Sequence, residues 1–599
     1  MVQFAVNMIS IKRMVSSSVS NLLMSAALAI VVAPELRAAA DKGKPNVIDI
    51  LTDDQGYGDL GCTGNDIIQT PNIDALWNDS IRLTDFHVNS VCSPSRAALL
   101  SGRHASAVGV WHTLAGRDLM RADAAIMPLA FAANGYRTFM AGKWHLGDNY
   151  PFRPEDRGFE QVYRIGGGSP GQIADYWGNG LFDTRYWNGT EWETSQGFCT
   201  DRQLDSLVRF IDEAKDAPFF IYWATTAMHS PVGAPDEYLA KYAGLDQERQ
   251  TFYGMVSNLD WNVGRLRAAL KKRGLNDNTI LLYLSDNGSA CDKKGKAGAY
   301  NAGLRGKKGS VYEGGHRVPC LIHWPDGKFT GGSDRPQLAA HFDLFPTLTE
   351  LCGIAAPESA TFDGQSLAPL LKNPDHPWPD RTLITDAKVN KRSRPYDSSS
   401  VMSGPWRLVN QGRELYDLRN DPGQTTDVAA KHPAQVARLR ESYDDWYETL
   451  EPGFSNVARV VIGSIKANPV RLTGMDVHAI GKSGGKTVWN QKGVLTAARH
   501  RGLWKLRVAR AGDYRISLRR WPAESGLKFA DTPRKGTPVT YQEARLSIGD
   551  YKLTQSVDAL SEQVTFSVAL KAGLTDLDAV LVQEDGHETT AYFVEVERR

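Results

Sequence analysis

The chain has 599 residues. A single hydrophobic core stops growing near ~250 to 300 residues, so two or three domains are expected. Hydrophobic residues make up 42% and charged residues 23% of the sequence, a globular composition that excludes a disordered or mainly membrane-embedded chain. The 69 Lys and Arg residues nearly cancel the 68 Asp and Glu residues, so no overall field favours nucleic acid or an anionic membrane surface as a partner.

The N-terminus has the three-part pattern of a secretory signal. Lys12 and Arg13 precede an apolar run over residues 22–33, and the small residues 38–40 follow. This run is shorter than the ~20 residues that a spanning helix needs, so we predict a signal peptide over residues 1–40, with a retained membrane anchor as the alternative. The mature protein is then periplasmic or secreted and does not span a membrane. The six cysteines are scattered, and no disulfide or zinc site can be assigned from their spacing.

Two apolar strands in the first two thirds of the chain end in polar clusters. Residues 46–52 run into a turn-rich acidic segment over 53–65, and residues 279–284 run into Ser-Asp-Asn-Gly at 285–288. Helices over 126–133 and 204–215 and strands over 137–141 and 219–225 lie between them. This alternation predicts an α/β domain over residues 41–380, with a mostly parallel sheet flanked by helices. In such sheets the site lies beyond the carboxyl ends of the strands.

The pattern changes near Pro379. Strands over 406–409 and 415–417 and a helix that carries Val436, Leu439, Tyr443 and Trp446 on one face predict a small α+β subdomain over residues 381–452. Beyond Pro452 the apolar residues alternate with polar ones, which predicts an antiparallel β-sandwich over residues 453–599. Within it, the two alternating stretches 504–508 and 514–518 flank a turn and are expected to form a hairpin.

Cys92 is the first candidate nucleophile. It opens the segment Cys-Ser-Pro-Ser-Arg-Ala-Ala-Leu-Leu-Ser-Gly-Arg, in which Pro94 suits a first helical position and Arg96 and Arg103 add positive charge. A helix N-terminus at Cys92 would stabilise a developing anion. Residue type alone favours a buried, inert cysteine, so the surrounding motif decides the interpretation.

That motif resembles the signature of the type I sulfatases, a family of the alkaline phosphatase superfamily. The resemblance extends over residues 45 to ~450 and includes Pro-Asn-Val at 45–47, Thr-Asp-Asp-Gln-Gly-Tyr-Gly-Asp at 52–59, Thr-Pro-Asn-Ile-Asp at 70–74, Gly-Lys-Trp-His-Leu-Gly at 142–147, Ser-Asp-Asn-Gly at 285–288 and Tyr-Glu-Gly-Gly at 312–315. It implies an alkaline-phosphatase-like fold. It also implies that a maturation enzyme oxidises Cys92 to formylglycine, an aldehyde whose hydrate is the nucleophile.

The acidic strand ends suggest a metal site. Asp53, Asp54, Asp286 and Asn287 offer only oxygen ligands, which suit calcium or magnesium rather than zinc. The resemblance implies one calcium ion at these positions, completed by the modified Cys92. By the same resemblance Arg96, Lys143, His145, His229 and Lys308 surround the sulfate. Lys143 and His145, two residues apart, would face one side in an extended backbone. Lys307 is the alternative to Lys308.

The resemblance also implies the roles of the catalytic residues. Asp286 would take a proton from the attacking hydroxyl, His229 would protonate the leaving alcohol, and His145 would act in the later release of sulfate. The implied activity is calcium-dependent hydrolysis of an aryl or carbohydrate sulfate ester. The alternatives are a phosphate or phosphonate monoester hydrolase of the same superfamily and a glycan-binding protein without catalysis.

Two further expectations follow from the sequence. Asp49 interrupts the apolar strand 46–52, and because a buried unpaired carboxylate is costly, it should pair with a neighbour or point outward. All candidate site residues precede Gly309, so a chain that ends near Pro452 is expected to keep hydrolysing a small aryl sulfate.

Overall fold

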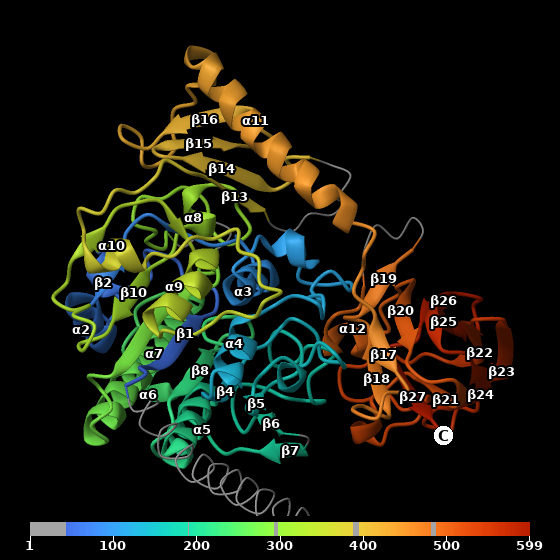
Figure 1. The fold of residues 1–599 in the computed structure, drawn as a ribbon. Coiled ribbons are helices and arrows are strands. Elements are labelled where there is room, and N and C mark those ends of the chain that lie inside the picture. The colour runs from blue at the N-terminus through green and yellow to red at the C-terminus, as the bar shows by residue number, and fades with distance from the viewer. Residues whose placement is uncertain (1–42, 190, 293–297, 387–394, 481–486) are drawn as a thin grey trace, which may run out of the picture.

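The structure is a computed structural model of the 599-residue chain that describes residues 43–189, 191–292, 298–386, 395–480 and 487–599. The proposed signal peptide lies outside the described residues. In the described part of the chain, no helix is both long enough and apolar enough to cross a membrane. Figure 1 shows a large α/β body, a small sheet with one long helix above it, and a β-rich body beside both.

The large body is built on a ten-stranded sheet. Its order is β11 (Asp334–Arg335), β2 (Ile81–Leu83), β10 (Cys320–His323), β9 (Thr279–Ser285), β1 (Asn46–Thr52), β8 (Phe219–Ala224), β4 (Arg137–Gly142), β5 (Gln161–Arg164), β6 (Arg185–Asn188) and β7 (Glu191–Thr194). The five central strands from β9 to β5 are parallel, while β10, β6 and β7 pair antiparallel with their inner neighbours. The sequence prediction of a mostly parallel sheet is therefore confirmed.

Helices cover both faces of this sheet, as expected for parallel strands that are buried on both sides. One face packs against α3 (Cys92–Ser101), α4 (Met127–Ala133) and α9 (Leu344–Leu351). The other packs against α2 (Pro71–Asp79), α5 (Cys199–Ala214) and α7 (Gln247–Lys272). The short helices are α6 (Asp236–Ala240), α8 (Glu313–His316) and α10 (Ala368–Lys372), and β3 (Phe86–His87) pairs with β12 (Ala339–Ala340).

The α+β subdomain predicted from the sequence is present. Its antiparallel sheet consists of β13 (Thr382–Asp386), β14 (Ser399–Ser403), β15 (Trp406–Val409) and β16 (Glu414–Asp417), and α11 (Pro433–Leu450) packs across it. Leu439 and Tyr443 of α11 are buried against this sheet, as the helical periodicity predicted. Val436 and Trp446 are only partly buried at its edge.

The C-terminal body contains two packed sheets. One holds β17 (Val460–Ile462), β20 (Gly502–Val508), β25 (Gly573–Gln583), β22 (Tyr541–Ile548) and β23 (Tyr551–Ser556), with β19 (Val477–Ala479) and β26 (Glu588–Thr590) at its side. The other holds β18 (Val470–Thr473), β27 (Phe593–Arg598), β21 (Gly512–Arg519) and β24 (Val564–Leu570). All pairs are antiparallel except β17 with β20, which is parallel. This body, residues 453–599, is called the β-sandwich below.

The predicted hairpin within the β-sandwich is wrong. β20 pairs with β25 in one sheet, and β21 pairs with β24 and β27 in the other, so residues 509–511 cross between the sheets. β20 alternates buried residues with less buried ones, and the apolar residues Tyr514, Ile516 and Leu518 of β21 are buried, because each strand turns one face toward the space between the sheets. Alternation therefore identified the strands but did not identify their partners.

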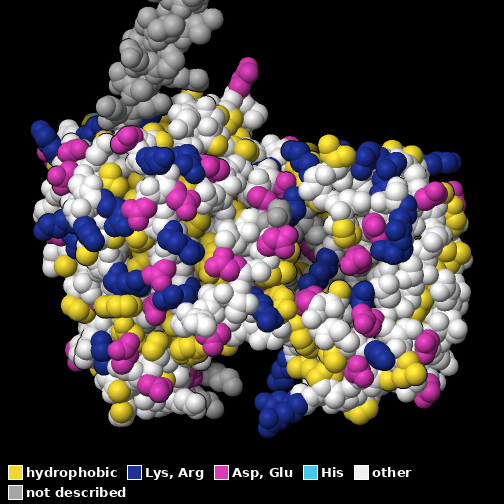
Figure 2. Space-filling view, turned by 90° about the horizontal axis from the view of Figure 1, so that it is seen from below, with side chains coloured by type: hydrophobic (Ala, Val, Ile, Leu, Met, Phe, Trp, Pro, Cys, Tyr) yellow, Lys and Arg dark blue, Asp and Glu magenta, His cyan; other side chains and the backbone are white. Residues whose placement is uncertain are grey.

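The charges on the surface are mixed. On the face in Figure 2, Lys and Arg side chains are interspersed with Asp and Glu side chains over both the larger and the smaller body. This agrees with the formal net charge of +1.

Candidate active site

The ends of β1 and β9 bring four oxygen-bearing residues together. The two strands are parallel neighbours, and their register places Thr52 opposite Ser285. Asp53 and Asp54 therefore leave the sheet beside Asp286 and Asn287, as the sequence analysis expected of two parallel strand ends. All four side chains are buried. Asp54 N donates to Asp286 Oδ1 at 3.2 Å, and Asn287 Nδ2 donates to Asp54 Oδ1 at 2.9 Å.

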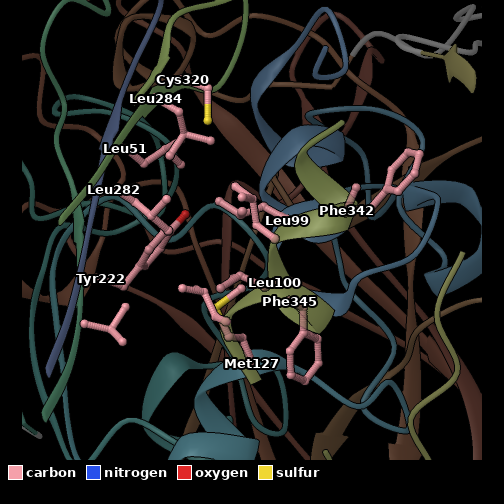
Figure 3. Close-up of a cluster of buried hydrophobic side chains, with 14 of the residues drawn as sticks. Leu51, Leu99, Leu100, Met127, Tyr222, Leu282, Leu284, Cys320, Phe342 and Phe345 are labelled. Atoms are coloured by element: carbon pink, nitrogen blue, oxygen red, sulfur yellow. The ribbon is translucent and has the colours of Figure 1, made fainter. Parts of the chain in front are cut away.

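Cys92 lies at the N-terminus of α3 and faces this cluster. It is the first residue of the helix, so the helix begins two residues before Pro94 rather than at it. All ten residues of α3 are buried, and Figure 3 shows Leu99 and Leu100 among the apolar side chains between α3 and the sheet. Potential ligand atoms of Asp53, Cys92 and Asp286 all lie within 4.8 Å of one another. The helix core thus fixes Cys92 against the two acidic strand ends.

Each of the three carboxylates is paired with one cation. Lys143 Nζ donates to Asp53 Oδ2 at 2.7 Å, and Lys308 Nζ donates to Asp54 Oδ1. Arg96 donates to Asp286 Oδ2 through Nε at 3.1 Å and Nη2 at 2.8 Å, and its Nη1 donates to the Lys143 carbonyl at 2.9 Å. Three positive groups therefore balance three negative groups in a buried site, which is the condition under which charges can be buried.

The site retains unused oxygen atoms that suit a hard cation. Asp53 Oδ1 and Asn287 Oδ1 are buried and have no hydrogen-bond partner among the described residues. Burial raises the pKa of Asp53, the Lys143 ammonium opposes this, and the neighbouring Asp286 and Asp54 carboxylates raise the pKa further. Unpaired buried oxygens beside carboxylates are costly unless a cation binds them. The donor set therefore fits a calcium ion held by Asp53, Asp54, Asp286, Asn287 and the group at Cys92.

Lys143 and His145 do not share an extended segment. β4 ends at Gly142, and His145 has a left-handed backbone conformation with φ +59°, so the expected common orientation in a strand is wrong. The His145 ring Nε2 lies 3.1 Å from the Thr113 carbonyl oxygen. Because a carbonyl only accepts, Nε2 carries the proton, and the buried Nδ1, without a partner in the described chain, is the basic nitrogen. Burial, with Lys143 and Arg96, holds the pKa of His145 well below its usual value.

His229 and Lys308 approach the site from two other loops. The His229 ring donates through Nδ1 to the Ser230 carbonyl at 2.6 Å, which leaves Nε2 for a ligand. Burial and the nearby Lys308 lower its pKa. Lys308 Nζ lies 4.0 Å from Cys92 Sγ. Lys307 instead donates to the carbonyls of Cys291 and Asp292 at 3.0 and 2.8 Å, so the geometry favours Lys308 as the residue at the site.

Asp49 neither pairs nor points outward, so both options expected from the sequence are wrong. Its side chain is fully buried in β1, and neither carboxylate oxygen has a hydrogen-bond partner among the described residues. Burial raises its pKa to about 7, although Arg96 opposes this shift. The protonated, neutral form avoids the cost of an isolated buried charge.

Sequence reasoning missed several residues around the site. The Thr113 carbonyl and Gly168 both contact or closely approach His145, and neither has a functional side chain that a pattern could reveal. It also missed a buried cluster of His87, Glu313 and His316, whose potential ligand atoms lie within 4.8 Å of one another. Glu313 accepts from Arg407 Nε at 2.8 Å, so this cluster is already charge-compensated and ties the subdomain to the large body.

Comparisons with known proteins show which family the chain resembles. Residues 45–354 match the model of the family described as Sulfatase, and residues 306–445 match N-sulphoglucosamine sulphohydrolase, C-terminal. Human arylsulfatase A is 32% identical over 463 residues, which cover 66% of this chain and 86% of that protein. Rat N-acetylgalactosamine-6-sulfatase is 29% identical over 437 residues, covering 68% of this chain and 81% of that protein. The structure of Ps i-CgsB in complex with k-i-k-neocarrahexaose is similar at a TM-score of 0.62 and 30% identity, covering 67% of this chain and 93% of that chain.

Proposed function

The chain belongs to the sulfatase family of the alkaline phosphatase superfamily and is a sulfate ester hydrolase, and from this premise we propose that it is calcium-dependent, uses a formylglycine made from Cys92 and acts on sulfated saccharides. The observation that carries the proposal is the joint placement of Cys92, the two acidic strand ends and their three paired cations in one buried site. The saccharide substrate is supported by the similarity to Ps i-CgsB, a structure solved with an oligosaccharide. Small aryl sulfates fit the same chemistry.

Two groups would complete the site. Calcium held by Asp53, Asp54, Asp286 and Asn287 would polarise the sulfate, and the hydrated aldehyde at position 92 would supply the attacking hydroxyl and a second hydroxyl for sulfate release. Lys143 and Lys308, which pair with Asp53 and Asp54 here, would neutralise the sulfate oxygens once calcium engaged these carboxylates. Maturation of Cys92 requires a formylglycine-generating enzyme as a partner.

The remaining residues move protons. Asp286, held by Arg96 and by the Asp54 amide, is placed to accept the proton of the attacking hydroxyl. His229 presents Nε2, and the negative charge of a bound sulfate ester favours its imidazolium form, which protonates the leaving alcohol. His145, neutral with a free Nδ1, accepts the proton that must be removed when sulfate is released. For His145, the neutral form that burial favours matches its role as a base.

Export of the protein belongs to the proposal as well. Export to the periplasm or the medium rests on the pattern of residues 1–40 alone. Glycan binding by the β-sandwich was an alternative function for the whole protein, but family membership now assigns the chain to the sulfatases.

The experiment that tests the proposal compares metal-dependent sulfate release by the wild type and by Asp54→Asn. The amide keeps the size of the side chain but removes one of three charges from the metal cage, so calcium affinity should fall and activity should need far more calcium. Chelation should abolish wild-type activity, and calcium should restore it. Exposed Asp550→Asn is the matched control and should behave as the wild type. Full activity in a sample shown by elemental analysis to hold no metal would contradict the calcium assignment.

A further inference from the structure

The β-sandwich shares buried surface with the large body. Ile173, in the loop between β5 and β6, is fully buried in one apolar cluster with Met475, Trp521 and Tyr592 of the β-sandwich. A second cluster places Leu119 and Phe152 of the large body among the core residues of the β-sandwich. Figure 1 shows the β-sandwich, with α12 (Gln491–Leu495) at its inner side, against the loops of the large body. The interface is therefore built like a core rather than like a flexible tether.

Gln491 concentrates the polar contacts across this interface. Its backbone N donates to the Gly171 carbonyl at 3.0 Å, and its side-chain Nε2 donates to the carbonyls of Gln172 and Tyr176 at 3.2 and 2.9 Å. Its Oε1 accepts from Gly178 N at 2.9 Å. The Gln491 side chain thus ties residues 172, 176 and 178 together, and both of its polar atoms are satisfied, while its backbone N holds Gly171.

The residues just before this loop segment contact the His145 ring. Gln172 Oε1 accepts from Gly168 N at 2.6 Å, which folds residues 168–172 into a tight turn. Gly168 packs directly on the imidazole, since a Cβ atom at this position would lie 2.5 Å from His145 Nδ1. A shift of the loop of a few tenths of an ångström would therefore change the space at the nitrogen that acts as the base.

The other neighbour of His145 is also tied to the β-sandwich. The Thr113 carbonyl that accepts from His145 Nε2 lies three residues before Gly116, whose N donates to the Met475 carbonyl at 3.0 Å. Gly116 is in close contact with His478, because a Cβ atom there would lie 2.3 Å from His478 Nε2. Both backbone segments that define the position of the His145 ring are thus anchored on the β-sandwich.

His145 depends on such anchors. It lies beyond the end of β4 in a left-handed conformation, so no strand pairing holds its backbone at that point. The regions that match family models, residues 45–354 and 306–445, both end before Met475 and Gln491. We propose that the β-sandwich is a positioning element of the active site, in which Gln491 acts through the 168–178 loop to hold the His145 ring in its working orientation. This inference rests on the proposed role of His145 in sulfate release.

The inference changes one expectation from the sequence. A chain that ends near Pro452 was expected to keep its activity on a small aryl sulfate, because all site residues lie earlier in the chain. The contacts argue against that expectation, because the truncation removes Met475 and Gln491 and exposes Ile173. The β-sandwich is an integral part of the site even for a substrate too small to reach it.

The test uses the full-length protein and the variant Gln491→Ala. Gln555→Ala is the control, since Gln555 on β23 is exposed and donates to the Thr565 carbonyl within the β-sandwich. In Gln491→Ala, hydrogen exchange in residues 166–178 should rise, kcat for an aryl sulfate should fall about tenfold, and KM should change less than about twofold. The first turnover of alcohol release should then become fast relative to steady-state turnover, because the slowed step follows alcohol release.

A purely structural defect gives a different result. Loss of active protein would lower the amplitude of the first turnover and kcat in parallel, and that outcome would overturn the inference. Faster exchange in the loop with unchanged kcat would overturn it too. If Gln491→Ala does not fold, Gln172→Ala is used instead, because it removes the acceptor of Gly168 N and should give the same kinetics. If both variants fold, the double variant should be no slower than the slower of the two single variants. Absence of sulfate release from the wild type would instead contradict the proposed function, while the exchange measurement still tests the anchoring of the loop.

Discussion

Asp49 gives a prediction about stability that can be worked out from its surroundings. The carboxyl group is buried in β1 without a hydrogen bond from any described residue, and its pKa rises from an ordinary 3.8 to about 7. Between these two pH values the folded protein holds a proton that the unfolded chain has released, so the free energy of unfolding falls as the pH rises. At about 1.4 kcal/mol per pH unit, the loss from this one group reaches roughly 4 kcal/mol by pH 7.

Asp49→Asn removes this loss, because the amide has nearly the shape of the protonated acid and does not ionise. We expect the variant and the wild type to differ by less than about 1 kcal/mol near pH 4, and the variant to be more stable by up to roughly 4 kcal/mol at pH 8. Urea unfolding followed by tryptophan fluorescence, with calcium present and both proteins compared at each pH, measures the difference. The other carboxylates cancel in this comparison.

The reasoning fails if Asp49→Asn is less stable than the wild type at pH 8. That result would mean that Asp49 is ionised in the folded protein. The attraction of Arg96, which lowers the pKa of Asp49, would then outweigh the effect of burial, which raises it. Asp550→Asn, at an exposed turn, should show no pH-dependent difference and controls for the removal of a carboxylate as such.

Two further predictions concern buried arginines. Arg407→Met breaks a buried pair with Glu313 and should lower the free energy of unfolding by about 3 to 5 kcal/mol, whereas Arg419→Met, at an exposed pair, should cost under about 1 kcal/mol in the same denaturant titration. An equal effect of both would contradict the importance of burial. Arg96→Lys keeps the charge but cannot make the contacts of both guanidinium nitrogens to Asp286, so kcat/KM for sulfate release should fall roughly 10²-fold with an unchanged circular dichroism spectrum. Wild-type kinetics in Arg96→Lys would show that charge alone suffices.

The sequence predicted the parts of the site that follow strand ends. An apolar run followed by an acidic turn locates both the strand and its functional edge, and the parallel pairing of β1 with β9 then brings Asp53 to Asp286. The Cys92 motif also predicted a helix N-terminus, and the structure places Cys92 at the first position of α3. Short-range patterns sufficed in these cases because the residues that act also define the ends of the elements.

The sequence could not predict what depends on distant partners. The apolar residues of β20 and β21 alternate as those of a hairpin would, but β20 pairs with β25, and β21 pairs with β24 and β27, all of which lie far along the chain. The burial of Asp49 is set by the helices that cover β1 and not by β1 itself. The anchoring of the His145 loops depends on Gln491, over 340 residues later in the chain, through backbone carbonyls that no residue pattern encodes. The domain boundaries near residues 380 and 452 stay predictions.

The mass of the tryptic peptide that contains Cys92, measured on purified active enzyme, tests the central claim most directly. The claim is that the group attacking sulfur is made from Cys92 by oxidation. The account predicts a peptide about 18 Da lighter than the encoded sequence, reactive toward hydrazides, in a fraction that follows the specific activity of each preparation. A stoichiometric, alkylatable thiol at Cys92 in fully active enzyme would contradict the account.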